Sequence, residues 1–209
     1  MAVPYKAPVK DIVFGYEVID SYNVLNKISA FSDFSEDIVI PTMEECAKFS
    51  EEVLAPINAI GDQQGATIKD GVVTMPEEFV DAYQKFAEAG WASISLPSDI
   101  GGGGMPITLS GGTLEILSTA NLAFGLAPGL SAGAISAINF HGSQEQKDKF
   151  LPKLVSGEWT GTMNLSEPQS GSDLGTITTK AEPQEDGSYK ITGTKAVSYT
   201  HLTLPTRLM

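Results

Sequence analysis

A polar loop near the C-terminal end of the chain carries the side chains best suited to bind a ligand. It runs Met163-Asn-Leu-Ser-Glu-Pro-Gln-Ser-Gly-Ser-Asp-Leu174 and holds serine hydroxyls at positions 166, 170 and 172. These hydroxyls can donate hydrogen bonds, Pro168 fixes one backbone angle, and Gly171 lets the main chain come close to a ligand. The pattern indicates a site for an anionic or heteroaromatic cofactor. The alternative is an ordinary solvated turn, because Ser, Gly, Pro and Asp are common turn residues.

The sequence around this loop changes from helical to β-strand periodicity. Apolar residues recur at helical spacing as far as about residue 155, and beyond Gly157 the chain becomes β-prone, with Glu185-Asp-Gly187 as a hairpin turn. The β-prone runs are 159–165, 177–181 and 189–192. We therefore predict an α+β fold, in which an all-helical N-terminal domain (1–157) is followed by the start of a β domain (158–196).

Six helical segments are expected in the first domain. They are 11–28 (as one helix or two), 36–60, 76–91, 108–118, 130–140 and 143–154. Ser143 is placed to cap the last of them, with Glu145 or Gln146 near the third position of a capping box. Phe79, Tyr83 and Phe86 share one helical face, which indicates core packing rather than a cofactor site.

Composition limits the functions that the chain could have. Its 209 residues suffice for a sizeable core, and 42% of them are hydrophobic. The net charge of −13 argues against nucleic-acid binding, which requires clustered Lys and Arg. The single cysteine, Cys46, excludes a disulfide framework, and without a basic cluster beside it we expect a core residue rather than a nucleophile. No metal site is predicted.

Two glycine-containing segments are interpreted as connections. The short apolar runs on either side of Asp70-Gly71 predict a small hairpin. Gly101-Gly-Gly-Gly104 lacks the Lys-Ser or Lys-Thr of a phosphate-binding loop and the preceding strand of a dinucleotide site. We therefore expect a flexible loop there.

No segment is expected to cross a membrane. The N-terminal residues lack the uninterrupted apolar core of a signal peptide. The most apolar region, 120–140, contains Asn121, Pro128 and several glycines, and we interpret it as a pair of buried helices rather than a span of about twenty residues. We therefore expect a cytoplasmic protein.

The order of residues in the polar loop resembles the flavin-binding signature of acyl-CoA dehydrogenases, in which a hydroxyl residue precedes Glu-Pro and Gly-Ser-Asp follows. The flanking segments 141–162 and 187–195 are similar to the same family, and the resemblance extends from about Tyr5 to Lys195. The opening 5–11 resembles the large, methylthiopropanoyl-CoA dehydrogenase-like members. This resemblance implies a helical domain followed by a β-barrel-like middle domain, of which the chain would contain only the start.

The resemblance also implies a reaction and a set of binding residues. The reaction is the oxidation of an acyl-CoA thioester to the trans-2-enoyl-CoA with FAD, as in fatty acid metabolism. Met163 and Leu165 would contribute backbone contacts to the flavin, and Ser166 a hydroxyl at its pyrimidine edge. Gly171 would allow a close approach to the cofactor. Ser172 would contact both the cofactor and the acyl-CoA substrate.

The same resemblance places the catalytic glutamate in a C-terminal domain that this chain lacks. No residue here is therefore predicted to be catalytic, and Glu167 is not proposed as a substitute. Electron-transfer flavoprotein is the implied electron acceptor, and the intact enzyme is expected to be a homo-oligomer. We expect the 209-residue chain alone to be inactive, poorly soluble and weak in flavin retention.

The family pattern ends after Lys195. A second flavin contact is expected there from a strand threonine, but Tyr199 occupies its place. The run that follows resembles the translation of a transposase adapter used in preparing DNA libraries, and we interpret 197–209 as a non-native tail. The alternative is a short native strand that ends at Pro205.

Two functions of other classes stay open. A serine hydrolase would use Ser170 or Ser172, although the Gly-x-Ser-x-Gly elbow is not matched and His141 is the one histidine outside the suspected tail. The other is a helical interaction module without catalysis, which would bind no flavin.

Overall fold

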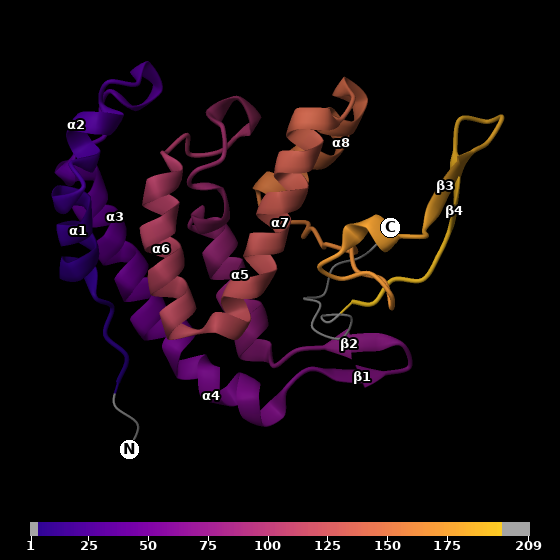
Figure 1. The fold of residues 1–209 in the computed structure, drawn as a ribbon. Helices are drawn as coiled ribbons and strands as arrows, with labels where there is room; N and C mark the ends of the chain where they lie inside the picture. Colours follow the sequence, from indigo (N-terminus) through magenta and orange to yellow (C-terminus); the bar gives the residue numbers. More distant parts are fainter. Residues whose placement is uncertain (1–3, 198–209) are drawn as a thin grey trace.

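The computed structural model describes residues 4–197, which form a bundle of helices joined by a long loop to a β-hairpin (Figure 1). The α-helices of this part of the chain are α1 (Val9–Val18), α2 (Ser21–Leu25), α3 (Glu36–Phe49), α4 (Ala55–Gln64), α5 (Glu77–Glu88), α6 (Ile107–Ala120), α7 (Leu122–His141) and α8 (Gln144–Val155). Residues 4–197 also contain two antiparallel pairs of strands, β1 (Thr67–Lys69) with β2 (Val72–Thr74) and β3 (Lys180–Pro183) with β4 (Tyr189–Thr192). The expected α+β class is confirmed. Most of the suspected tail lies outside the described residues.

The predicted helix over 36–60 is interrupted by a π-helix at Ser50–Leu54. Pro56 stands in the first turn of α4, the helix that follows. The carbonyl of Leu54 accepts a hydrogen bond from Asn121 Nδ2 at 3.1 Å. Because a π-helix shifts the register of the backbone, it presents this carbonyl to a side chain that is distant in the sequence.

The glycine run after α5, expected as a flexible loop, is joined to the residues before it by backbone hydrogen bonds. The N–H of Gly103 donates to the carbonyl of Ser93 at 2.9 Å. The N–H of Gly104 donates to the carbonyl of Leu96 at 2.9 Å. A Cβ on Gly103 would lie 2.6 Å from the Ile94 carbonyl oxygen, so the glycine is needed for close approach of two backbones.

Helices α6 and α7 pack side by side and are joined at Asn121 (Figure 1). The side chain of Asn121 caps α7 by accepting a hydrogen bond from the N–H of Phe124 at 3.1 Å. The expected pair of buried helices at 120–140 was wrong, because α7 is a single helix of 20 residues. Its outer face is exposed at Leu122, Leu126 and Phe140.

Among the described residues, α7 is the one helix long and apolar enough to cross a membrane by length and composition alone. This corrects the expectation that no segment reaches such a length. Core helices of soluble proteins meet the same criterion, and 17% of its most apolar stretch is buried within this chain. Length and composition therefore do not assign α7 to a membrane.

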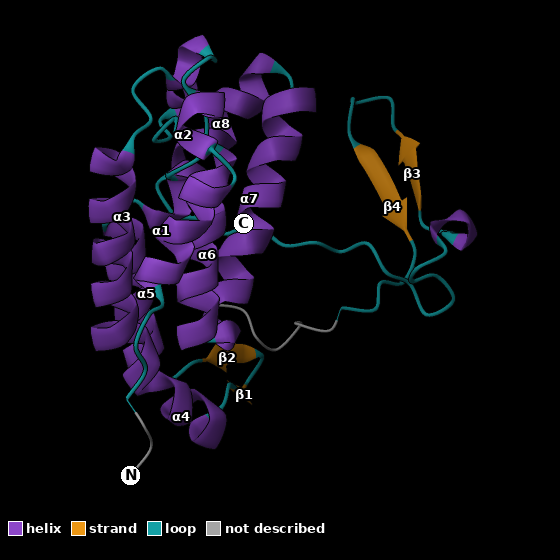
Figure 2. Ribbon diagram, turned by 60° about the vertical axis from the view of Figure 1, so that its left-hand side comes forward, coloured by secondary structure: helices purple, strands orange, loops and turns teal. Residues whose placement is uncertain are grey.

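After α8 the chain leaves the helices and reaches a hairpin that stands apart from them (Figure 2). The predicted capping box begins α8, with the N–H of Gln146 donating to Ser143 Oγ at 3.3 Å and the N–H of Ser143 donating to Gln146 Oε1 at 2.8 Å. The predicted strand at 159–165 does not form in the described structure, and its residues 162–165 line a cavity together with α7. Strands β3 and β4 are joined by the expected turn at 185–187, and all their residues are exposed.

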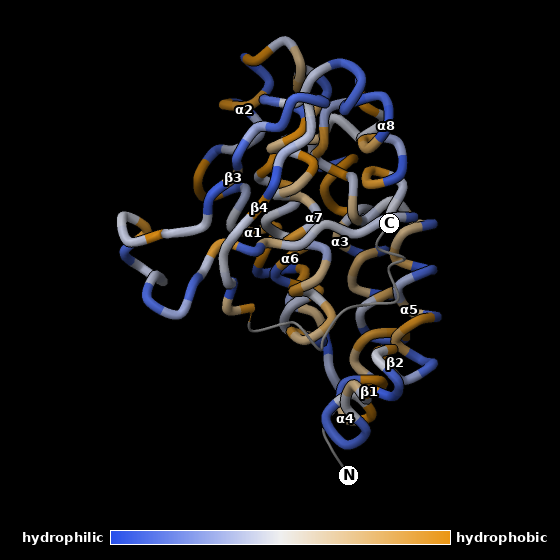
Figure 3. The backbone as a smooth tube through the Cα atoms, turned by 90° about the vertical axis from the view of Figure 1, so that its right-hand side faces the viewer, coloured by the Kyte–Doolittle hydropathy of each residue, from blue (hydrophilic) through white to orange (hydrophobic). Residues whose placement is uncertain are grey.

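The hydrophobic core lies within the helices, where the apolar residues gather (Figure 3). Phe79 and Phe86 are buried in it, as their spacing predicted, with Tyr83 partly buried against them. Cys46 is fully buried, which confirms the expected core position, and burial raises the pKa of its thiol to about 12. The thiol is therefore protonated at neutral pH and is no nucleophile.

Candidate functional site

The polar loop forms a closed turn between the helices and the β3–β4 hairpin. Glu167 and Ser170 pair through two backbone hydrogen bonds, with N···O distances of 2.8 and 3.0 Å. Pro168 and Gln169 form the exposed tip of this turn. Ser170 Oγ donates to the carbonyl of Asp173 at 2.8 Å and thereby closes the loop on itself. The turn is thus held internally.

The position of Ser170 weakens the alternative of a serine hydrolase. Its side chain is buried, and its hydroxyl proton is committed to a carbonyl of the same loop. In the described structure no base accepts a hydrogen bond from it, and His141 is exposed at the end of α7. A nucleophilic serine needs a base within hydrogen-bond reach, which this arrangement does not provide.

Glu167 is a buried carboxylate at the centre of the loop, with 1% of its side chain exposed. Hydrogen bonds from Thr179 and Thr178 hold the pKa of this carboxyl well below its usual range, against the opposing effect of burial. Lys195 Nζ lies 3.0 Å from Glu167 Oε1 and balances its charge. An ionised carboxylate with this many donors is a weak base, so Glu167 is unsuited to accept a substrate proton.

A cavity of about 460 Å³ lies between α7 and the segment that enters the loop. Its walls are formed by Gly129, Leu130, Gly133, Ala134, Ala137, Thr162, Met163, Asn164 and Leu165. A Cβ added to Gly129 or Gly133 would meet nothing within 4 Å, so larger side chains there would extend into open space. The lining is apolar apart from Thr162 and Asn164, which suits a flat or aliphatic group.

Gly161 fixes how close the segment comes to α7. Its N–H donates to Ser131 Oγ at 3.0 Å, and a Cβ at this position would lie 3.2 Å from Ser131 Cα. The backbone therefore approaches α7 more closely than a larger residue would allow. This contact positions the residues that follow, among them Met163.

The structure brings some of the predicted cofactor residues together and not others. Met163 and Leu165 both line the cavity. Ser166 follows them, half-buried, and its carbonyl accepts a hydrogen bond from the N–H of Ala196 at 2.9 Å. Gly171 and Ser172 are exposed on the turn and are not among the cavity residues. Within residues 4–197, neither the Ser166 nor the Ser172 hydroxyl has a hydrogen-bond partner, so both are free to bind a ligand.

The sequence analysis did not predict that α7 forms one wall of the 460 Å³ cavity. Gly125, Gly129, Gly133 and Ala137 recur every four residues, a spacing that places small side chains on one helical face. That spacing was a usable signal. The central role of Glu167 had no such signal, because its partners Thr178, Thr179 and Lys195 are 11 to 28 residues away.

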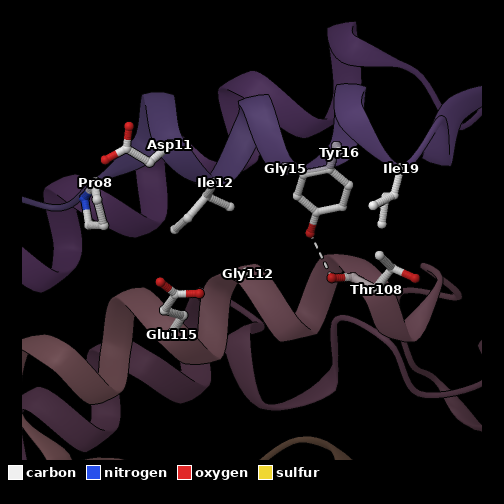
Figure 4. Close-up of a pocket in the computed structure, with 9 residues that line it drawn as sticks. All are labelled: Pro8, Asp11, Ile12, Gly15, Tyr16, Ile19, Thr108, Gly112 and Glu115. Atoms are coloured by element: carbon white, nitrogen blue, oxygen red, sulfur yellow. Dashed lines mark hydrogen bonds between the residues drawn. The ribbon is translucent and has the colours of Figure 1, made fainter.

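A second cavity of about 470 Å³ lies between α1 and α6 (Figure 4). Asp11 and Ile12 line it from α1, and Glu115 lines it from α6 on the opposite side. The hydroxyl of Tyr16 donates to the carbonyl of Thr108 at 2.6 Å and is not available to a ligand. None of the predicted site residues lies here, so we place the candidate site at the loop and α7.

Comparison with known proteins gives one consistent result. Residues 41–158 match the family model described as acyl-CoA dehydrogenase, N-terminal domain. The chain is 42% identical over 191 residues to the 3-methylmercaptopropionyl-CoA dehydrogenase of Ruegeria pomeroyi, an alignment that covers 91% of this chain and 32% of the relative.

Solved structures agree with the sequence match. The acyl-CoA dehydrogenase of Bacillus anthracis, crystallised with FAD, superposes with a TM-score of 0.64 at 26% identity, covering 78% of this chain and 26% of the other. A chain from the electron transferring flavoprotein study of Acidaminococcus fermentans superposes with a TM-score of 0.65 at 26% identity, covering 78% and 40%. The chain spans about a third of the length of the curated relatives that it matches.

Proposed function

Because the chain belongs to the acyl-CoA dehydrogenase family, we propose that it forms the N-terminal part of a flavoprotein that oxidises an acyl-CoA thioester to the trans-2-enoyl-CoA. FAD, when bound, supplies the acceptor for the hydrogen that leaves the β carbon as hydride. The observation that carries this proposal is the cavity between α7 and the polar loop. It combines a wall of small residues with two of the residues predicted to contact the flavin.

The residues at this cavity fit a flat heteroaromatic ring. Gly129 and Gly133 leave room along α7, and Met163 and Leu165 face the same space. The hydroxyl of Ser166, free within the described chain, would bind polar atoms at the edge of the ring. We propose that these residues bind and orient the cofactor.

The exposed part of the turn supports a separate role for Gly171 and Ser172. A Cβ on Gly171 would meet nothing within 4 Å, so the backbone there is open to a close approach. The Ser172 hydroxyl lies on the same exposed turn. We propose that Gly171 and Ser172 contact the cofactor beyond its ring, and that Ser172 also binds the acyl-CoA.

The proposed reaction needs a base for the α proton, and this chain offers no suitable carboxylate at the cavity. The lining residues include neither aspartate nor glutamate, and Glu167 is held in its ionised form by surrounding donors. We propose that the longer protein supplies the base. The 209-residue chain alone is then expected to have no dehydrogenase activity.

We further propose the setting in which the intact protein works. Electron-transfer flavoprotein would accept the electrons from the reduced cofactor, and the intact enzyme would be a cytoplasmic homo-oligomer. These proposals rest on membership of the family. The outer face of α7, exposed at Leu126 and Phe140, is consistent with burial against further protein in the complete enzyme.

The test uses the native gene, sequenced across codon 196 and expressed to the length of its relatives. The purified protein should be yellow, should retain FAD through gel filtration and should reduce an electron-acceptor dye with an acyl-CoA. A protein that stays colourless after incubation with FAD would contradict the proposal and favour a non-catalytic helical module. Labelling by a fluorophosphonate probe would instead revive the serine hydrolase.

A further inference from the structure

Glu167 is a buried carboxylate in a loop whose tip is exposed to solvent. Its side chain is 1% exposed, whereas Pro168, Gln169 and Gly171 around it are exposed. Burial of a carboxylate is costly unless hydrogen bonds and an opposite charge compensate for it. The contacts of the Glu167 carboxylate therefore show which segments of the chain it connects.

Five donors converge on this carboxylate from three parts of the chain. Oε2 accepts from Gln169 Nε2 at 2.6 Å, from the N–H of Thr178 at 2.9 Å and from Thr178 Oγ1 at 3.0 Å. Oε1 accepts from the N–H of Thr179 at 3.0 Å and from Lys195 Nζ at 3.0 Å. One side chain thus joins the loop to the start of the hairpin and to the segment that follows it.

The segment that follows the hairpin reaches the candidate cofactor residues directly. Lys195 Nζ donates a second hydrogen bond, to the carbonyl of Leu165 at 3.1 Å. The next residue, Ala196, donates its N–H to the carbonyl of Ser166 at 2.9 Å. Two consecutive carbonyls are therefore fixed by the segment that Glu167 holds through Lys195.

We propose that Glu167 and Lys195 are positioning residues that set the orientation of Leu165 and Ser166 toward the cofactor. The inference rests on the proposed function and goes beyond it, since neither residue contacts the cavity. The lysine is held by the glutamate and in turn holds the Leu165 carbonyl. Loss of either partner frees the backbone that presents the Ser166 hydroxyl.

The substitution Glu167→Gln keeps the shape of the side chain and removes its charge. A glutamine has one acceptor oxygen, and its amide nitrogen is a donor that faces other donors. At least one backbone N–H from Thr178 or Thr179 then loses its partner. Lys195→Met removes the cation and leaves the glutamate buried without its charge partner.

A matched control is available on the same hairpin. Asp186 is an exposed carboxylate, and the hydrogen bond from the Ser188 hydroxyl holds its pKa below the usual range. The substitution Asp186→Asn makes the same chemical change, carboxylate to amide, without touching the loop. Any effect shared by both variants would come from loss of charge alone.

The first measurement needs no cofactor and uses the 209-residue chain. Amide hydrogen exchange at Thr178, Thr179 and Ala196 should be faster by about tenfold or more in Glu167→Gln. The two threonine amides lose their charged acceptor, and the bond from Ala196 to the Ser166 carbonyl loosens because the neighbouring Lys195 loses its partner. Lys195→Met should accelerate exchange at Ala196, and Asp186→Asn should leave all three amides unchanged. Protection within α3 and α6 reports whether the helices remain folded. Equal exchange rates in the wild type and Glu167→Gln would overturn the inference.

The second measurement uses the full-length protein with FAD. Glu167→Gln and Lys195→Met should weaken FAD binding by about tenfold or more, while Asp186→Asn changes it less than about twofold. At saturating FAD, both positioning variants should also shift the absorption bands of the bound flavin, which simple destabilisation would not do. If amide exchange is faster but the FAD affinity and the flavin spectrum are unaltered, Glu167 is a structural residue and the positioning role is refuted. A wild-type protein that binds no FAD would refute the proposed function and the positioning role, and the hydrogen-exchange result would still stand.

Discussion

The helical region and the loop with its hairpin are stabilised by different forces. Between α1 and α8 most buried residues are apolar, and the largest fully buried ones include Met43, Leu54 and Ile116. Between 159 and 197 the buried residues are Glu167 and Ser170, both polar. One region is stabilised by burial of hydrophobic surface, the other by hydrogen bonds to a charge. Substitutions and pH should therefore act on them separately.

The exposed hairpin shows why the second region depends on the hydrogen bonds to Glu167. Every residue of β3 and β4 is exposed on both faces, including Tyr189 and Ile191. A two-stranded hairpin without an apolar face against a core is marginal in water. Its connection to the rest of the chain passes through Thr178 and Thr179, which donate to Glu167.

The largest expected effect is in the aromatic core of the helices. Phe86 is 2% exposed, and its ring meets that of Phe124 edge to face, with centroids 5.5 Å apart. We expect Phe86→Ala to lower the free energy of unfolding by about 3–5 kcal/mol, because it leaves a cavity in a closely packed core. Denaturant titration followed by far-ultraviolet circular dichroism measures it. Tyr189→Ala on the exposed hairpin is the control, and equal losses in both would remove the distinction between the regions.

Adjacent glycines of α6 provide a sharper test of packing. A Cβ on Gly112 would lie 2.7 Å from Met43 Cε and 2.9 Å from the Tyr16 hydroxyl, whereas one on Gly111 would meet nothing within 4 Å. We expect Gly112→Ala to destabilise the chain by about 1–3 kcal/mol through overpacking. Gly111→Ala should stabilise it by up to about 1 kcal/mol, since alanine favours a helix. The same titration compares the two, and the prediction is lost if their effects have the same sign.

The sequence predicted those features of the fold that depend on neighbouring residues. The capping box at Ser143, the turn at Asp70-Gly71 and the core face of Phe79 and Phe86 are each set within a few positions. The site prediction likewise placed Met163 and Leu165 together, because they share one short segment, and both line the same cavity.

Features that depend on distant partners were not predictable. The π-helix that ends at Leu54 and the single helix α7 both meet at Asn121, which donates to the Leu54 carbonyl and caps α7. One buried side chain thus satisfies backbone groups at both places, the π-turn within the predicted helix 36–60 and the start of α7. Glu167 is the same kind of residue, since its role arises only when Lys195 returns to it.

Acid should act on the loop before it acts on the helices. Since the pKa of Glu167 is depressed in the folded chain, its contribution is fully present above the unfolded value of about 4.3 and is lost as pH falls toward the folded value. We expect amide protection at Thr178 and Thr179 to decrease below about pH 4, while the helices stay folded. Hydrogen exchange measured against pH tests this. The variant Glu167→Gln should show no such dependence, and an unchanged profile in the wild type would disprove the charge-based account.

High pH should destabilise the helices, whereas low pH acts on the loop. Burial raises the pKa of Cys46 and of Tyr16 to about 12 in the folded chain. Stability from these groups is present below their unfolded values of about 8.5 and 10, and it falls as pH rises toward 12. Unfolding titrations between neutral and alkaline pH should show this loss. Tyr16→Phe and Cys46→Ala together should make the decline shallower.

The smallest effect is expected at Ile191 on β4, which is 72% exposed. Ile191→Thr keeps a β-branched side chain, so strand propensity changes little and no buried surface is lost. We expect a change within about 0.5 kcal/mol of the wild type. Unfolding titrations at two protein concentrations provide the measurement. A larger loss that grows with concentration would mean that the hairpin is covered by a second molecule, and the second region would then depend on apolar burial after all.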